Sequence, residues 1–374
     1  MSEKRQVTVV LRAPSAAIFG SEDMESPGGL RIERWESTVG PVTIAYRTRL
    51  IEGADGSKVA GQLWIEVVGE ASSLKDCIAP FANASLELLP IVALSANASI
   101  GHPDVELAFE SGPGLAERAY FQHYLPPERQ IPHAGRHIHI ASAIALLAAM
   151  HASPRRERLT RATNQYALAL SNWRLGLETL TVAHLWMSLE ALTPVVIDSE
   201  VLRRGLSSKA ELAASMGLTS RDLDTVARRD WLLAGDADCY KEAKAASDGF
   251  EHGYGSFPDM RQAATKHRRR IANLVREAIF DLAGLDAEAA AILKAPPFDQ
   301  PMGHWPLATY LWGKLVGTVS DLARPESAYP FVGLRPQLVA TAPGGLPNLQ
   351  FQFTPELGAG ITFLPDHVEV WQPD

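Results

Sequence analysis

Cysteine is scarce in this sequence, which has two, Cys77 and Cys239, among 374 residues. The two lie far apart, and neither belongs to a spacing typical of metal ligands. We therefore expect no disulfide framework, and the composition favours a protein of the reducing cytoplasm.

Long apolar runs are also lacking. The run at residues 6–11 is too short for a signal-peptide core or a membrane span. The longest later run, around residues 140–150, is again shorter than a bilayer requires and is flanked by His and Arg. We expect a cytoplasmic protein without a membrane partner.

Several well-known catalytic motifs are absent. The sequence has no Gly-x4-Gly-Lys-Ser/Thr loop, no Gly-x-Gly-x-x-Gly turn after a strand, no Gly-x-Ser-x-Gly and no His-Glu-x-x-His. Nothing therefore favours an ATPase, a dinucleotide-dependent enzyme, an α/β-hydrolase or a zincin, and we expect no cofactor.

One group of histidines has a spacing that resembles metal ligands. His133 and His137 would share a helical face, with His139 close behind. Pro132 and Gly135 make a helix start there unfavourable, and no cysteine lies nearby. We expect no metal site.

The net charge of −8 argues against a protein coated with nucleic acid over its whole surface. A local basic patch is compatible with that charge, because phosphate binding depends on clustered Lys and Arg. The length suggests two domains or three short ones.

The first part of the chain, residues 1–131, has the pattern of a strand-rich α+β domain. Short runs rich in β-branched and aromatic residues predict strands at residues 6–11, 42–49, 61–68 and 105–109. Residues 73–96 look helical, but Pro80 and Pro90 must break or kink that helix.

The middle part, residues 132–295, predicts an all-helical bundle. The expected helices cover residues 137–152, 160–194, 208–216, 220–233, 238–250 and 258–285. Ser207 or Ser208 and Thr219 or Ser220 are suitable N-caps. The helix over 160–194 is apolar around most of its surface and should be buried.

The last part, residues 296–374, begins with a proline-rich linker. Strand-like runs then follow at residues 308–319, 349–353, 360–364 and 368–371. This tail is too short for a sizeable core of its own, so we expect it to extend the N-terminal sheet or wrap the helices. The predicted fold class is α+β.

One polar pair in the helical part suggests chemistry. Asp248 and His252 lie four residues apart at the end of a predicted helix, so both project from one face. Gly253 follows directly.

The central segments resemble the HEPN superfamily, specifically its Apea-like branch, over roughly residues 160–285. Residues 173–177 and 184–193 look like its first core helix, and residues 240–253 resemble its Arg-x4–6-His region, often Arg-Asn-x3-His. The helix over 264–282 would be the closing helix. The resemblance implies a helical bundle that pairs as a homodimer.

In that family, His and Arg are thought to form a metal-independent ribonuclease site. The resemblance gives His252 the proton-transfer role, Asp248 the Asn-like position, and Glu190 the acidic position facing the site. Ser247 occupies the arginine position. A serine cannot supply a permanent positive charge at the phosphate, although Lys244 or Arg261 could supply a cation from nearby.

A strongly basic run follows the motif. Six Lys and Arg residues and no acid occur between Arg261 and Arg276, and the run includes Lys266, Arg268, Arg269 and Arg270. It predicts a phosphate-binding strip. The alternative is a solvated helix face balanced by acids on neighbouring helices.

The expected function is an HEPN-like module that binds RNA or a nucleotide, acting in stress response or defence as a homodimer. One alternative is a metal-independent endoribonuclease that uses His252. A further alternative is a structural protein in which Asp248, His252 and Gly253 form a helix C-terminus at an interface.

Overall fold

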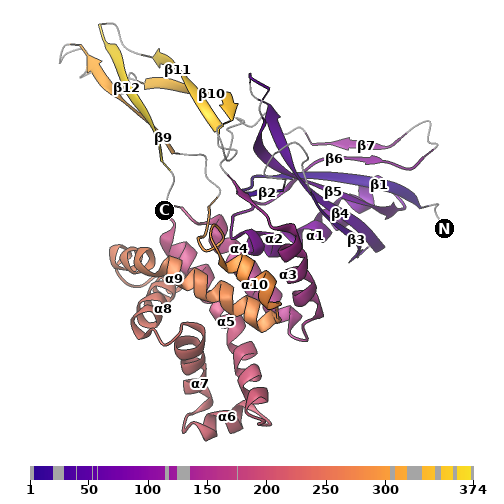
Figure 1. Cartoon of the computed structure of the whole chain (residues 1–374), viewed down its shortest axis with the longest axis vertical. Helices are drawn as coiled ribbons and strands as arrows, with labels where there is room; N and C mark the ends of the chain where they lie inside the picture. Colours follow the sequence, from indigo (N-terminus) through magenta and orange to yellow (C-terminus); the bar gives the residue numbers. More distant parts are fainter. Residues whose placement is uncertain are drawn as a thin grey trace.

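A computed structural model describes residues 4–19, 29–38, 40–52, 54–56, 58–113, 118–123, 135–174, 176–303, 308–317, 331–341, 347–356 and 360–371. Over these residues the fold is mixed α+β, which confirms the predicted class. It has a six-stranded N-terminal sheet, a helical region from α3 to α10, and small C-terminal β ladders (Figure 1).

The N-terminal sheet is antiparallel throughout, because every strand pair in it runs antiparallel. Alternating apolar residues place one face in the core, as in β1 with Val7, Val9 and Leu11. The strands in spatial order are β3 (Leu30–Ser37), β4 (Gly40–Glu52), β5 (Lys58–Ala71), β1 (Arg5–Ala13), β6 (Asp104–Glu110) and β7 (Tyr120–Gln122).

Helix α1 (Leu74–Leu86) packs against the sheet, whereas α2 (Leu89–Ala96) packs mainly against the helical region. Pro80 lies inside α1, whereas Pro90 lies in the first turn of α2, where its missing N–H costs nothing. The predicted break therefore falls between the two prolines. A short parallel pair, β2 (Ala17–Ile18) and β8 (Arg136–His137), leads into the helices.

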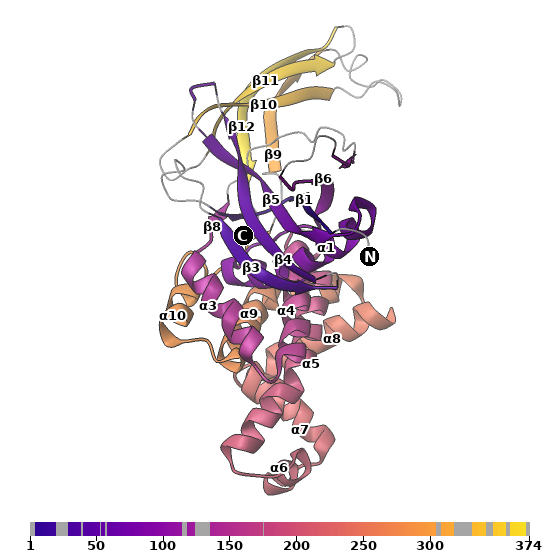
Figure 2. The same cartoon turned by 90° about the vertical axis from the view of Figure 1, so that its right-hand side faces the viewer.

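The helical region lies beneath the sheet, with its α6–α7 end farthest from it (Figure 2). Ser208 and Thr219 are the observed N-caps of α6 and α7, and Thr219 forms a capping box with Asp222. The helices are α3 (Ile140–Ala152), α4 (Arg156–Ser171), α5 (Glu178–Arg203), α6 (Lys209–Ser215), α7 (Ser220–Val226), the π-helix η1 (Ala227–Leu232), α8 (Ala237–His252), α9 (Phe257–Ala283) and α10 (Ala287–Lys294).

The expected single helix over residues 160–194 is two helices, so that boundary prediction was wrong. The chain leaves the helix at Asn172, and Gly176 adopts a φ of 89° that an α-helix cannot contain. In the other direction α5 continues through Pro194 to Arg203. Its many buried side chains offset the cost of about 3 kcal/mol for an internal proline.

The C-terminal strands pair with each other: β9 (Ala308–Val316) with β12 (Thr362–Trp371), and β10 (Phe331–Thr341) with β11 (Pro347–Glu356). Among the described residues none joins the N-terminal sheet, so the expected extension of that sheet was wrong. The ladders lie at the end of the molecule opposite α6 and α7, away from the helices (Figures 1 and 2).

One hydrophobic core joins the sheet to the helices. It continues from Val7 in β1 through Phe81 and Tyr166 to Leu293 in α10, and so crosses the boundary placed at residue 131. A smaller cluster, which includes Val201, Leu212 and Leu223, packs α6 and α7 against the end of α5.

Two stretches, Leu74–Ala96 and Glu178–Arg203, are long and apolar enough to cross a membrane by length and composition alone. Both are more than half buried here, as core helices of globular proteins also are. Cys77 and Cys239 are buried free thiols.

A buried arginine ties the sheet to the helical region. Arg276 of α9 is 3% exposed and donates to the carbonyl oxygens of Leu94, Ser95, Leu293 and Phe298 at 2.6–3.2 Å. Burial lowers its pKa to about 10, so it stays charged at neutral pH. Arg276, the last base of the predicted strip, therefore does not belong to the surface.

Other polar side chains form hydrogen bonds at the same contact between the N-terminal part and the helical region. Asn97 caps α2 in the left-handed conformation, accepts from the Tyr166 hydroxyl at 2.6 Å and donates to the Phe298 carbonyl at 2.8 Å. Arg136 donates to the carbonyls of Ala96 and Asn97. Hydrogen bonds from Arg276 of α9 and from these side chains thus hold the C-terminal ends of α2 and α10 together.

Candidate nucleic-acid interface

The motif that the sequence singled out lies at the turn between α8 and α9. His252 is the last residue of α8, and Gly253 caps that helix with a φ of 69°. The exposed His252 ring stacks on Tyr254, with ring centroids 6.1 Å apart and 5° between the planes. Neither ring nitrogen of His252 hydrogen-bonds to a described residue.

Asp248, the other member of the polar pair, is held by Lys244 one turn earlier on α8. The hydrogen bond to Asp248 raises the pKa of Lys244. Asp248 is therefore occupied by a neutralising partner, and Lys244 is not a free cation for the motif.

Ser247, the residue that the resemblance aligns with an arginine, is buried. Ser247 is 0% exposed and its hydroxyl donates to the Glu251 carboxylate at 2.8 Å. The position supplies neither charge nor access to solvent. An anion near His252 would need its cation from another residue.

Glu190 lies toward the opposite end of the bundle from His252. Its carboxylate pairs with Arg228 of η1 at 3.2 Å. One turn earlier on α5, Trp186 packs against Tyr240 near the start of α8. Tyr240 precedes His252 by about 18 Å of helix, at 1.5 Å per residue, so the fold does not bring Glu190 to the motif.

The acid of α5 that lies at this end is Glu178, which the sequence analysis missed. It is 2% exposed, accepts from the Gly176 N–H at 3.0 Å and lies 3.3 Å from Arg261 Nε. Burial raises its pKa, but the hydrogen bond from Gly176 and the charges of Arg261 and Arg268 outweigh burial and lower it. The sequence signal was an acid two residues after a glycine, typical of a helix start.

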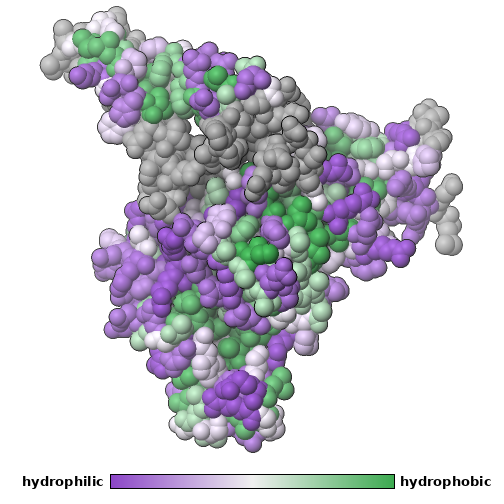
Figure 3. Space-filling view, viewed as in Figure 1, coloured by the Kyte–Doolittle hydropathy of each residue, from purple (hydrophilic) through white to green (hydrophobic). Residues whose placement is uncertain are grey.

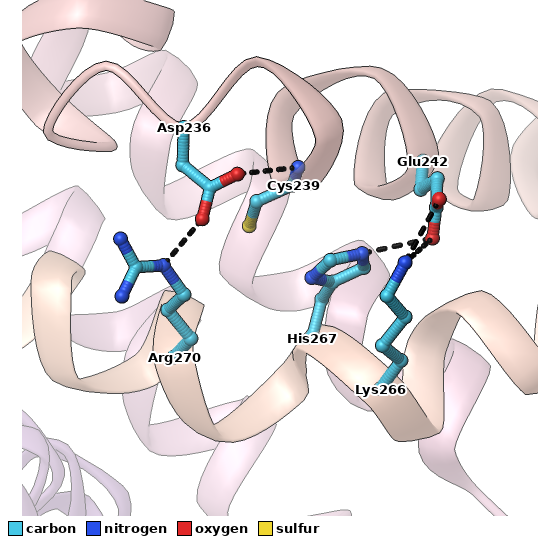
Figure 4. Close-up of polar contacts among 6 residues, drawn as sticks. All are labelled: Asp236, Cys239, Glu242, Lys266, His267 and Arg270. Atoms are coloured by element: carbon cyan, nitrogen blue, oxygen red, sulfur yellow. Dashed lines mark hydrogen bonds and ion pairs between the residues drawn. The ribbon is translucent and has the colours of Figure 1, made fainter.

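Acids of α8 balance much of the basic strip on α9 (Figure 4). Glu242 accepts from Lys266 at 3.0 Å and from His267 Nε2 at 2.8 Å. Asp236 caps α8 through the Cys239 N–H and pairs with Arg270 at 2.6 Å. Lys266, His267 and Arg270 thus connect α9 to α8 and are not available only to solvent or a ligand.

Two basic residues of the strip, Arg268 and Arg269, have neighbours other than the acids of α8. Arg268 lies over the Trp173 ring, 5.1 Å from its centroid. Arg269 is exposed, and no described residue forms an ion pair with it. Together with the pairs above, these contacts leave a modest positive field rather than a row of unbalanced cations.

Two grooves flank the first turns of α9. One, of about 530 Å³, is lined by residues that include Ala246, Tyr254 and Met260. The other, of about 670 Å³, is lined by residues that include Phe257 and Arg261, and Lys266 lines both. Figure 3 shows hydrophilic residues gathered over the α8 and α9 side of this face.

Aromatic side chains stand in solvent at the same turn. Tyr254 is 56% exposed, Phe257 57% and Phe250 42%. Contiguous exposed apolar side chains mark interaction surfaces, whereas single exposed ones are common on any protein. The three rings at this turn therefore make it a candidate binding surface.

The described residues contain no group of three or more His, Cys, Asp or Glu side chains that could hold a metal ion. His139 instead caps α3 through Ser142. His137 lies in β8, and His133 lies outside the described residues.

Glu178→Gln should lower the free energy of unfolding by about 2 kcal/mol at pH 7, because the Gly176 N–H would then donate to a neutral oxygen and the ion pair with Arg261 would be lost. The folded-state pKa of Glu178 lies below the ordinary 4.5, so its stabilisation is complete above pH 4.5. It disappears as the pH falls through the folded-state pKa. Urea unfolding from pH 7 to pH 3 should show the two proteins converging.

Glu157→Gln is the matched control, since Glu157 is 89% exposed and 3.6 Å from Arg161. It should change stability by less than about 0.5 kcal/mol. A Glu178→Gln difference that stayed constant across this pH range would contradict the assigned role of the Glu178 charge.

A scan against protein-family models, a search of the curated proteins and a search of the solved structures each gave no match to this chain.

Proposed function

We propose that residues 160–285 form an HEPN-like bundle whose α8–α9 turn binds single-stranded RNA. The observation that carries this proposal is the pair of largely exposed rings, Tyr254 and Phe257, each beside a groove. Arg261 and Lys266 line the same grooves. Binding sites for single-stranded nucleic acids that tolerate many sequences combine aromatic side chains, on which nucleobases stack, with positively charged side chains.

Stacking should contribute more to this binding than charge. Each base stacked on an aromatic ring contributes about 1–3 kcal/mol. Arg261 and Lys266 already face Glu178 and Glu242, which reduces their attraction for phosphate. We expect a shallow salt dependence, with a log–log slope of roughly −1.5, as for two phosphate contacts.

The site chemistry favours binding over cleavage. RNA cleavage through its own 2′-OH requires proton transfer and a cation at the phosphate oxygens. His252 could transfer a proton, but the position that should carry the cation is the buried Ser247. We assign His252 a role in binding: it stacks on Tyr254 and so orients that ring for contact with the RNA.

The proposal includes the homodimer that the resemblance implies. Sedimentation of the full chain at micromolar concentration tests this part separately from RNA binding.

The double variant Tyr254→Ala/Phe257→Ala should weaken RNA binding at least about thirtyfold, because it removes two stacking surfaces that contribute about 1–3 kcal/mol each. Fluorescence anisotropy with a labelled unstructured RNA of about twelve nucleotides, in low salt with EDTA, measures the change. Tyr120→Ala is the matched control, since Tyr120 is 61% exposed on β7.

Unchanged affinity in the double variant, or no binding by the parent protein at low salt, would reject the proposal. The same reactions on a denaturing gel test cleavage. RNA cut in EDTA by the parent but not by His252→Ala would assign an endoribonuclease instead.

A further inference from the structure

A second cavity lies far from the α8–α9 turn along the chain, between the edge of the sheet and the helices. Its volume of about 460 Å³ is in the range of small-molecule sites. Strand β3, the turn after α1, and helices α2, α3 and α4 all contribute to it. Its lining includes Trp35, Ile91, Leu147, Met150, His151 and Arg156.

A bulge in the edge strand β3 aims Trp35 into this cavity. Ile32 pairs with Ile44 and Trp35 with Val42, so three steps on β3 oppose two on β4. The extra residue puts Ile32 and Trp35 on the same side of the sheet, and both pack against the core. A regular strand would have placed them on opposite faces.

The bulge stores local strain. Arg34 has a φ of 55°, in the left-handed region that side chains other than glycine rarely adopt. Strained backbone of this kind persists where the surrounding structure holds it, and it concentrates at binding sites.

Polar groups surround the Trp35 ring and fix its orientation. Its Nε1 donates to Glu87 at 3.3 Å. The Arg156 guanidinium lies 5.8 Å from the ring centroid, and the His151 ring meets it edge-on at 5.9 Å. The indole is thus a preorganised wall rather than a loose surface residue.

One cation of the cavity lining, Arg156, has a charge available to a ligand. Glu157 pairs with Arg161 at 3.6 Å, whereas Glu87 keeps its negative charge, because the indole N–H that it accepts from is neutral. Arg156 has no carboxylate partner among the described residues, and His151 lies beside the same ring. A guanidinium can bind a carboxylate or phosphate through two parallel hydrogen bonds.

The remaining wall is apolar, formed by Ile91, Leu147 and Met150. We propose that this pocket binds a small planar aromatic anion, with its ring between Trp35 and the apolar wall and its acidic group on Arg156. Carboxylate and phosphate share this chemistry, and the experiment below separates them.

Isothermal titration calorimetry with the full chain tests the site, with indole-3-acetate as the carboxylate probe and AMP as the phosphate probe. Indole-3-ethanol and adenosine supply the same rings without charge. At least one anion should bind at least about tenfold more tightly than its neutral partner, and the tighter anion identifies the acidic group.

Arg156→Gln should remove this tenfold preference and leave the neutral probes unchanged, and Arg158→Gln, on the exposed surface of α4, should change nothing. Trp35→Phe and Trp35→Leu should weaken charged and neutral probes alike, the leucine variant more strongly. Circular dichroism checks that each variant folds.

Three outcomes would overturn the proposal: no binding of any probe at millimolar concentration, equal affinity for charged and neutral partners, or an Arg156→Gln protein that keeps the preference. The Tyr254→Ala/Phe257→Ala protein separates this site from the RNA surface. It should keep the anion affinity of the parent, and anion binding lost there would move the site to the α8–α9 turn.

Discussion

Replacing Arg276 with methionine is expected to lower the free energy of unfolding by about 3 kcal/mol, the loss typical of a broken buried polar contact. Methionine fills a similar space but donates no hydrogen bond. The carbonyls of Leu94, Ser95, Leu293 and Phe298 would lose their shared donor. Urea unfolding at pH 7, followed by circular dichroism, measures the effect.

Arg276 stabilises the fold through its hydrogen bonds, and its charge acts in two opposite ways. Burial disfavours the charged form and lowers its pKa to about 10. The contribution of Arg276 is to pair carbonyl groups at the C-terminal ends of α2 and α10, where helix dipoles are negative.

Arg269→Met is the control for Arg276→Met, because Arg269 lies on the same helix but is exposed. It should change stability by less than about 0.5 kcal/mol. If the two substitutions lowered the free energy of unfolding equally, the stabilising role assigned to the buried Arg276 would be refuted.

Gly249→Ala should destabilise the protein by about 2 kcal/mol, a cost typical of overpacking, and weaken RNA binding. An added Cβ would lie 2.7 Å from the Tyr254 carbonyl oxygen and would meet Met260 Sδ. Tyr254 would have to move, and with it the ring that we assign to stacking. Thermal unfolding and the anisotropy assay report the two effects.

Whether Gly249→Ala raises or lowers the stability tests how closely α8 and α9 approach each other. Inside an unobstructed helix, Gly→Ala stabilises by about 1 kcal/mol, so a more stable Gly249→Ala protein would contradict the close approach of α8 and α9. Met260→Ala in the Gly249→Ala background should recover part of the stability, because it removes one of the two obstructing groups. Lys241→Ala, on the exposed surface of α8, controls for substitution in that helix.

Local patterns were sufficient to predict much of the fold. The run of β-branched residues at 6–11 identified the strand β1, and Thr219 with Asp222 identified a helix start. Gly253 identified the end of α8. Each signal depends on neighbours within about four residues, which the sequence displays directly.

Helical periodicity by itself does not divide the basic strip. Arg276 follows Ala272 by four residues and precedes Ile279 by three, which places it on the buried face of α9. Arg269 lies seven residues before Arg276 and so on nearly the same side of the helix, yet it is exposed. What separates the two is tertiary packing, because the ends of α2 and α10 cover α9 at Arg276.

Which distant groups meet was decided only by the tertiary structure. The sequence alone could not show that Arg261 faces Glu178, that Glu190 faces Arg228, or that Trp35 lies under Arg156. These contacts depend on where helices break and how they pack, as at Gly176, which starts α5 late and brings Glu178 to the motif. The sequence by itself determined the α+β class and the local ends of its elements, because those follow from short-range backbone chemistry. The charge balance and the cavities arise from long-range packing, which no local pattern encodes.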